Sequence, residues 1–306
     1  MIQNAPILLF CYKRLDSLQQ TVSALKKCEC SPESELHIFS DGAKADQDKK
    51  AVEDVRAFIK GISGFKKVII KESERNRGLA SSIIEGVTDV MKFSDRVIVL
   101  EDDLVVSANF LAYMNQGLEY YADHLKVYSI SGYTVPMKVP AGYGYDVYFL
   151  PRASSWGWAI WKNRWENIDW QVSDFAEFSK NRENIRQFNE GGSDMFAMLK
   201  KQMNREIDSW AIRWCYHQFK TQTYSVFPVS SKVQNIGFTS DATNTHVYNR
   251  YRTDLDNGSA LHFKFLADVE LDPIFLRQFQ RFYSKYTRAV SKIKTYIIKA
   301  RHKANG

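Results

Sequence analysis

Residues 96–103 read Arg-Val-Ile-Val-Leu-Glu-Asp-Asp, a short apolar segment that runs directly into three acidic residues. The β-branched side chains of this segment predict a buried strand. Glu101, Asp102 and Asp103 would then lie together at the end of the strand, where adjacent carboxylates repel one another. A hard divalent cation such as Mg²⁺ or Mn²⁺ would relieve this repulsion, and the alternative interpretation is a solvated acidic loop.

The residues before this segment alternate between predicted strands and predicted helices. Apolar runs predict strands at residues 6–12, 36–40 and 67–71, and helical spacing of apolar residues predicts helices at 15–25, 46–60 and 79–91. This order predicts an α/β fold with a mostly parallel, doubly wound sheet. Ligands of such sheets bind beyond the carboxyl ends of the strands, where this sequence places polar residues.

The composition limits the compartment of the protein. The 306 residues suffice for one large α/β domain with a C-terminal extension. No segment has membrane-spanning length, and no signal-peptide pattern is present. The four cysteines are too few for a disulfide framework, and Cys28 and Cys30 lack the second half of a zinc site. We therefore expect a cytoplasmic protein without structural zinc.

Positive charge is concentrated at the C-terminus. Nine basic and no acidic residues follow Asp272, so residues 1–272 carry −2 of the net charge of +7. Apolar side chains recur at helical steps from Phe275 to Ile297, which predicts a basic amphipathic helix over residues 271–306. The helix would lie on an anionic membrane surface or pack against its own domain, and both alternatives stay open. Nucleic acid is a poor candidate partner because the body is slightly acidic.

Four segments at the predicted strand ends carry a resemblance to a known family. They are Phe10-Cys11-Tyr12-Lys13-Arg14, Ser40-Asp41-Gly42, Asn76-Arg77-Gly78-Leu79 and Glu101-Asp102-Asp103. In this order they resemble the nucleotide-sugar half of GT-A glycosyltransferases, and within them the N-acetylglucosaminyltransferase I group and bacterial polysaccharide glycosyltransferases. The resemblance covers about residues 5–250. It implies a three-layer α/β/α catalytic domain over residues 1–270, with the nucleotide-sugar half at 1–106 and the acceptor half at 107–270.

The resemblance assigns the acidic triplet to the metal and the donor. Asp103 would be the direct ligand of Mn²⁺ or Mg²⁺, and Asp102 and Glu101 would bond donor hydroxyls and metal-bound waters. A metal at this place neutralises the charge that develops on a nucleoside diphosphate leaving group. No glycine fingerprint follows the first strand and no Gly-Lys-Ser/Thr loop is present, so the nucleotide would bind without either phosphate loop.

The other three segments would hold the nucleotide. By the same resemblance, Asp41 accepts a hydrogen bond from the uracil imide N–H, and Arg14 lies near the diphosphate. Asn76, Arg77 and Gly78 would close the nucleotide pocket. The alternatives are a surface salt bridge for Arg14 and simple turn chemistry for Gly78.

Tryptophan is abundant after residue 150. Indole faces stack on the C–H faces of sugar rings, and a glycine between two indoles would let a substrate approach the backbone. We expect Trp156 and Gly157 to contact the donor. The alternative is an aromatic core, which the helical spacing of Trp161 and Trp165 from Trp158 favours.

Residues 205–214 resemble the acidic-aromatic segment that opens a helix beside the acceptor in the same group. Asp208 aligns with the general base, which takes the proton of the acceptor hydroxyl in an inverting displacement. The alternative role for Asp208 is the N-cap of the helix, and Glu206 is then the second candidate for the base.

Residues 235–246 form a polar, turn-rich stretch that resembles a loop of bacterial sugar transferases. Such a loop often places a histidine on the metal or the diphosphate, which makes His246 a candidate second metal ligand. A solvent-exposed loop histidine is the alternative.

Taken together, these features predict a metal-dependent, inverting glycosyltransferase. It would move a sugar from a nucleotide-diphosphate donor, expected to be UDP-linked, to a glycan or lipid-linked acceptor in cell-surface polysaccharide synthesis. One rival is a sugar-nucleotide nucleotidyltransferase, which normally carries a glycine-rich basic loop after the first strand. The other rival is a non-catalytic sugar-binding protein, against which the intact acidic triplet argues.

Overall fold

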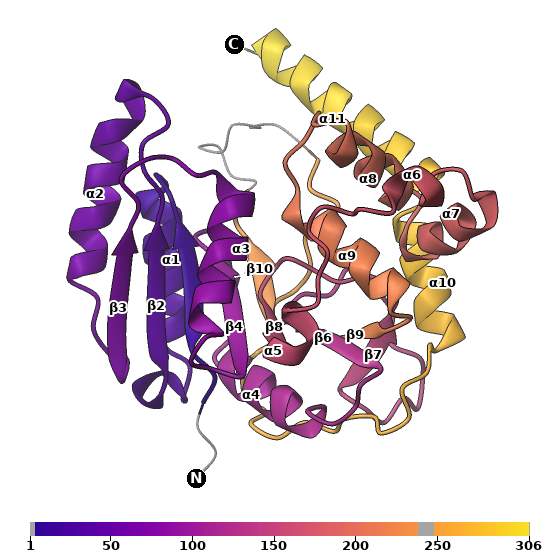
Figure 1. The fold of residues 1–306 in the computed structure, drawn as a ribbon, viewed down its shortest axis with the longest axis horizontal. Helices are drawn as coiled ribbons and strands as arrows, with labels where there is room; N and C mark the ends of the chain where they lie inside the picture. The colour runs from indigo at the N-terminus through magenta and orange to yellow at the C-terminus, as the bar shows by residue number, and fades with distance from the viewer. Residues whose placement is uncertain (1–3, 238–247, 306) are drawn as a thin grey trace.

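A computed structural model of the protein describes residues 4–237 and 248–305 (Figure 1). The strands are β1 (Ile7–Cys11), β2 (Glu35–Ser40), β3 (Lys67–Glu72), β4 (Arg96–Glu101), β5 (Leu104–Val106), β6 (Val127–Ser131), β7 (Val147–Leu150), β8 (Trp158–Trp161), β9 (Tyr224–Pro228) and β10 (Val233–Asn235). The helices are α1 (Leu15–Lys26), α2 (Lys49–Lys60), α3 (Leu79–Val90), α4 (Phe110–Tyr120), α5 (Lys162–Trp165), α6 (Phe175–Phe178), α7 (Arg182–Phe188), α8 (Met195–Met203), α9 (Trp210–Lys220), α10 (Pro273–Phe282) and α11 (Lys285–Asn305), with short 3₁₀ turns at Ser31–Glu33, Asp46–Asp48 and Asn189–Gly191.

One large sheet organises the molecule. Its eight strands follow the order β3-β2-β1-β4-β8-β6-β9-β7. The first four are parallel neighbours, β8 is antiparallel to β4 and β6, β9 is parallel to β6, and β7 is antiparallel to β9. The predicted strand and helix repeats of the first hundred residues are confirmed, and the carboxyl ends of β1 to β4 meet at one edge.

The strands are apolar on both sides because helices cover both faces of the sheet. Ile7 and Leu9 of β1 pack in a cluster with α1, α2, α4 and α10. Leu8 and Phe10 point to the opposite cluster, which contains α3, α8 and α9. This alternation follows from the two-residue period of a strand. The expected three-layer α/β/α architecture is confirmed.

A second, two-stranded sheet lies beside the end of β4. It pairs β5 with β10 antiparallel, and Leu104 is opposite Asn235. Since β5 follows Asp103 directly, this pairing brings the chain after β10 next to the acidic triplet. Segments more than 130 residues apart in the sequence therefore share one corner of the molecule.

Most of the tryptophan-rich region is core. Trp158–Trp161 form β8 and not the helix that their spacing indicated, and α5 follows directly. Because strand side chains alternate, Trp158 packs with Trp165 on one face, and Trp161 lies on the other face, where its Nε1–H donates to Leu118 O at 3.0 Å. The core interpretation of Trp161 and Trp165 is therefore correct.

The basic C-terminal segment is helical, and it is divided into two helices. Phe275 and Phe279 of α10 are fully buried against the sheet, so this part packs on its own domain. The chain then breaks at Tyr283 and Ser284, and α11 runs along the periphery of the molecule (Figure 1). Within the described residues, none of the helices is both long enough and apolar enough to span a bilayer.

Candidate functional site

Glu101, Asp102 and Asp103 lie at the carboxyl end of β4, as predicted. Asp102 and Asp103 are buried, and Arg14, just beyond β1, forms ion pairs with both. The distance from Arg14 Nη1 to Asp103 Oδ2 is 2.8 Å, and Arg14 Nη2 contacts Asp102 Oδ1. The backbone N–H of Tyr12 donates to Asp102 Oδ2 at 3.2 Å. Arg14 is therefore part of the acidic site and not of a peripheral surface salt bridge.

The triplet carries more negative charge than its neighbours compensate. Burial, followed by repulsion from Asp103 and Asp102, raises the pKa of Glu101 to about 8. Burial also raises the pKa of Asp102 to about 6, although Arg14 opposes this shift. A single guanidinium thus faces three carboxylates, and a further cation would be attracted to them.

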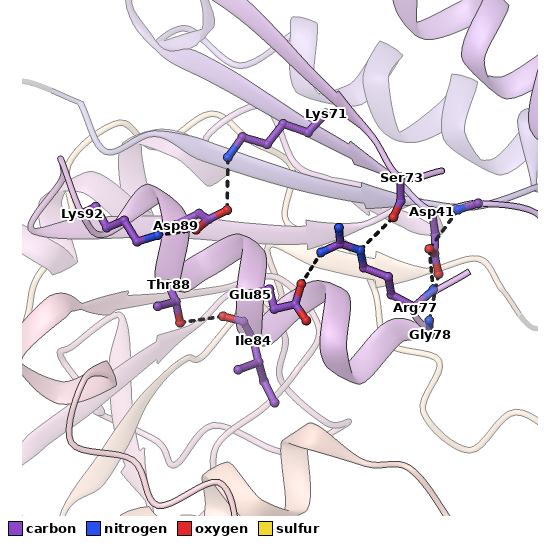
Figure 2. Close-up of polar contacts among 11 residues, drawn as sticks. Asp41, Lys71, Ser73, Arg77, Gly78, Ile84, Glu85, Thr88, Asp89 and Lys92 are labelled. Carbon is purple, nitrogen blue, oxygen red and sulfur yellow. Dashed lines mark hydrogen bonds and ion pairs between the residues drawn. The ribbon is translucent and has the colours of Figure 1, made fainter. Parts of the chain in front are cut away.

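Asp41 lies at the end of β2 and holds the start of α3. Its two oxygens accept from the backbone N–H groups of Gly42, Arg77 and Gly78 at 2.9–3.0 Å, and from Asn76 Nδ2 at 3.0 Å. Figure 2 shows the Asp41 carboxylate facing Arg77 and Gly78, directly before α3. A carboxylate has about four acceptor positions, so this network uses the capacity of Asp41. Asp41 therefore holds the turn at residues 76–78 that leads into α3, a structural role that the sequence did not reveal.

Gly78 and Asp208 meet at the same corner. Gly78 is the N-cap of α3 with φ of +77°, a conformation that favours glycine, so the predicted turn chemistry is present. A β-carbon at Gly78 would lie 3.9 Å from Asp208 Oδ2. The first turns of α3 and α9 therefore bring the proposed donor pocket and the proposed base together, although these residues are 130 positions apart in sequence.

Asp208 does not cap its helix. The N-cap of α9 is Ser209, whose hydroxyl accepts from Ile212 N at 3.4 Å. The Asp208 side chain is 66% exposed and lies 3.6 Å from Arg213 Nη2. The N-cap alternative for Asp208 is therefore wrong. Glu206, the second candidate, is exposed and accepts from Asn204 Nδ2 at 3.0 Å.

The chain after β10 crosses directly over Asp103. Ile236 N donates to Asp103 O at 2.9 Å. A β-carbon at Gly237 would lie 2.2 Å from Asp103 Oδ2 and 3.1 Å from Arg14 Nη1, so only glycine fits at this place. The predicted metal-site loop thus starts on the acidic triplet. His246 lies outside the described residues.

Trp156 and Gly157 have different surroundings. Gly157 is packed by protein atoms, because a β-carbon there would lie 2.6 Å from Val233 Cγ2. Trp156 is half-buried and lines a cavity of about 330 Å³, where its ring contacts those of Tyr133 and Tyr251 edge to face. Ser209 lines the same cavity. The cavity therefore adjoins the residue that follows Asp208.

One buried ion pair in this cavity was not predicted. Arg152 forms two hydrogen bonds with Asp194, at 3.0 and 3.2 Å, and its guanidinium stacks 4.1 Å from the Tyr283 ring centroid. These residues come from distant parts of the chain and share no motif, so no sequence signal could have paired them. Thr21, whose hydroxyl donates to Asp102 O at 3.1 Å, is a second residue without a sequence signal.

The donor set at the triplet suits a hard divalent cation by its chemistry. Carboxylate oxygens are the ligands that Mg²⁺ and Mn²⁺ prefer. Burial, the largest cause, raises the pKa values of Glu101 and Asp102, and a bound cation would favour their charged forms. A cation on Asp103 would share that carboxylate with Arg14 or displace it. Among the residues that the structure covers, no preformed cluster of three or more His, Cys, Asp or Glu side chains has metal-binding geometry.

Comparisons with known proteins give similarity at the level of structure. No protein-family profile and no curated protein matches the chain. A mannosyltransferase from Pyrobaculum calidifontis, solved with GDP-Man and Mn²⁺, is similar with a TM-score of 0.37 and 12% identity over 55% of this chain and 48% of its own. The glycosyltransferase GlyE of Streptococcus pneumoniae has a TM-score of 0.34 and 10% identity, over 72% of this chain and 45% of its own. TarS of S. aureus has a TM-score of 0.29 and 12% identity over 49% and 25%. The chain matches less than half the length of each.

Proposed function

We propose that the protein is a metal-dependent, inverting glycosyltransferase that uses a nucleotide-diphosphate sugar, with UDP as the nucleotide. The observation that carries the proposal is the placement of three carboxyl groups, Glu101–Asp103, at the parallel edge of the sheet, where Arg14 forms ion pairs with two of them. Open α/β sheets bind their ligands at this edge. A divalent cation would be attracted to carboxylates at this place, and it would supply positive charge for a bound diphosphate.

The donor would bind between the ends of β1, β2 and β4. Asp103 would hold the metal, with His246 as a second ligand by resemblance, and Asp102 and Glu101 would bond water and donor hydroxyls. When bound, the metal supplies positive charge that stabilises the diphosphate leaving group. Arg14 would turn part of its guanidinium toward the diphosphate. Asp41 would fix the turn from Asn76 to Gly78, so any contact with the base would share its oxygens with that turn.

Asp208 is the proposed general base. Its exposed carboxylate lies beside Gly78, where an acceptor hydroxyl could reach it. The acceptor oxygen would attack the anomeric carbon as the bond to the diphosphate oxygen breaks and its electron pair leaves with UDP. The hydroxyl proton would pass to Asp208. Attack opposite the leaving group inverts the anomeric configuration.

The cavity next to Ser209 is the proposed place for the acceptor, so Trp156, expected from the sequence to contact the donor, would contact the acceptor instead. Trp156, Tyr251 and Tyr283 give it aromatic surfaces, and the serines 154 and 155 give it hydroxyls. Aromatic walls with a few polar groups suit a sugar ring. We place this activity in the cytoplasm, in the synthesis of a cell-surface polysaccharide, on a glycan or lipid-linked acceptor at the inner face of a membrane.

Calorimetric titration of UDP into the protein, first with Mn²⁺ and then with EDTA, tests the proposal. We expect binding with Mn²⁺ and a loss of at least tenfold in affinity with EDTA. GDP, CDP and dTDP titrated in the same way would identify the base. Absence of binding by all four nucleotides would leave a non-catalytic protein on this scaffold. Formation of a nucleotide sugar from a sugar phosphate and UTP would favour a nucleotidyltransferase instead.

A further inference from the structure

The two C-terminal helices turn their apolar residues in opposite directions. In α10, Phe275 and Phe279 are 0% and 1% exposed. In α11, Tyr286, Ile293, Tyr296 and Ile297 are 79%, 59%, 74% and 44% exposed. A single continuous helix would present one apolar stripe to one partner, whereas the break at Tyr283 and Ser284 gives the two helices different partners.

The side of α11 that faces the body is polar. Arg288 Nη1 donates to Ser193 Oγ at 3.4 Å, and Thr295 Oγ1 accepts from Tyr248 N at 3.1 Å. Ser291 lies between them on the same side and is only half-exposed. Hydrogen bonds therefore hold α11 on the domain, while Tyr286, Ile293, Tyr296 and Ile297 stay exposed.

The outward side of α11 is apolar and has lysines along both borders. Tyr286, Ile293 and Ile297 follow one another at steps of seven and four residues, which places them on one face. Lys285 and Lys292, both exposed, border this face on one side. Lys294 is exposed on the other side, where its ammonium also donates to the Tyr248 hydroxyl at 3.3 Å. No acidic residue occurs after Asp272. Lysines of this kind bury their alkyl chains and extend their ammonium groups to an anionic surface.

We propose that the outward face of α11, defined by Tyr286, Ile293, Tyr296 and Ile297 with Lys285, Lys292 and Lys294, binds the surface of an anionic lipid bilayer. Apolar side chains between cationic borders match the depth profile of a bilayer, with acyl chains below anionic headgroups. This inference rests on the proposed location of the enzyme at the inner face of a membrane. It does not depend on the proposed glycosyl transfer. Because α11 is fixed to the body, binding would also orient the catalytic edge.

Co-sedimentation of the full chain with phosphatidylcholine vesicles, with and without phosphatidylglycerol, tests this inference. We expect binding only to the anionic vesicles, weakened by salt. The double substitution Ile293→Glu and Ile297→Glu should lower the partition coefficient at least about tenfold. Lys285→Gln with Lys292→Gln should lower it by about 25-fold, since each basic residue near the surface contributes about fivefold. Leu125→Glu changes a leucine that is 72% exposed elsewhere and should have no effect.

Three results would overturn the inference. They are no binding to anionic vesicles, equal binding to neutral vesicles, and a lipid-free dimer in light scattering that Ile293→Glu dissociates, which would assign the face to a second copy of the chain. UDP titration of the same variants should be unchanged, because the substituted residues are not among the hydrogen-bond partners of Asp102 and Asp103. Vesicle binding without UDP binding would therefore reject the proposed chemistry and leave the membrane contact standing.

Discussion

Asp41 and Asp103 are both aspartates beyond the end of a parallel strand, and the protein surrounds them in opposite ways. Asp41 accepts three backbone N–H groups and the Asn76 amide. Asp103 shares the single Arg14 guanidinium with Asp102, and Glu101 lies beside it. The first carboxylate is satisfied by its own chain, and the second belongs to a cluster that is short of positive charge.

This difference separates a structural carboxylate from a binding carboxylate. A saturated carboxylate stabilises the fold and has little acceptor capacity left for a ligand. A cluster of under-compensated carboxylates destabilises the empty fold, and a cation relieves it. Substitutions at the two places should therefore separate stability from activity.

The largest expected effect is the loss of activity in Asp103→Asn. The change removes the proposed metal ligand at nearly constant shape, so kcat/KM for transfer should fall at least about 10³-fold, or about 4 kcal/mol. Stability should change by less than about 1 kcal/mol, because Asp102 still pairs with Arg14 and repulsion within the triplet decreases. Steady-state kinetics and thermal unfolding of the same preparation measure both quantities. An active variant with a lowered Tm would make Asp103 a structural residue.

The second effect is the loss of transfer without a loss of donor binding in Asp208→Asn. An amide cannot take the acceptor proton, so kcat should fall by about 10²- to 10³-fold. UDP affinity should stay within about twofold, since Asp208 contacts the start of α3 only from outside. Glu206→Gln is the matched control and should retain activity. If the control is the inactive variant, the base is Glu206.

The sequence predicts the first hundred residues of the fold well because their elements follow one another locally. Each of β1 to β4 is a short, largely apolar run that ends at polar residues, and the next element after β1, β2 and β3 is helical. The triplet and Arg14 are found by this logic, since strand ends of a parallel sheet share one edge. The order of β8, β6, β9 and β7 is not predictable in this way, because it arises from pairings between distant segments.

The candidate site is only partly readable for a similar reason. A side chain's type is visible in the sequence, but its number of partners is not. Asp41 reads as a free acceptor after a strand, yet it receives donors from residues 35 to 37 positions away. In the same way, the sequence allows Asp208 to be the N-cap of α9, whereas the structure has Ser209 at that position. The sequence shows the apolar stripe of the C-terminal segment. It does not show the break at Tyr283 and Ser284, after which the apolar side chains face outward.

The third effect is a loss of stability in Asp41→Asn. One oxygen becomes an NH₂ group that faces donors, so two of the four hydrogen bonds are lost and the free energy of unfolding should fall by about 2–3 kcal/mol. Urea denaturation measures the change. Asp46→Asn, at a carboxylate that is 92% exposed, is the control and should not change the midpoint. An unchanged midpoint in Asp41→Asn would instead favour a ligand-binding role for Asp41.

The smallest effect concerns the pH dependence of stability and the carboxylate of Glu101. Burial and the neighbouring acids raise the pKa of Glu101 to about 8, so the folded state binds this proton more tightly than the unfolded state, whose pKa is near 4.5. The resulting stabilisation is complete below about pH 4.5 and is lost as the pH rises toward 8. We therefore compare Glu101→Gln with the parent protein in EDTA as the pH rises from about 4.5 to 8. The variant should lose about 1–2 kcal/mol less of its free energy of unfolding, because an amide does not titrate. Tm measured against pH for both proteins tests this. Parallel curves of Tm against pH would mean that the fold already balances the charge of the triplet. The contrast between the surroundings of the triplet and those of Asp41 would then disappear.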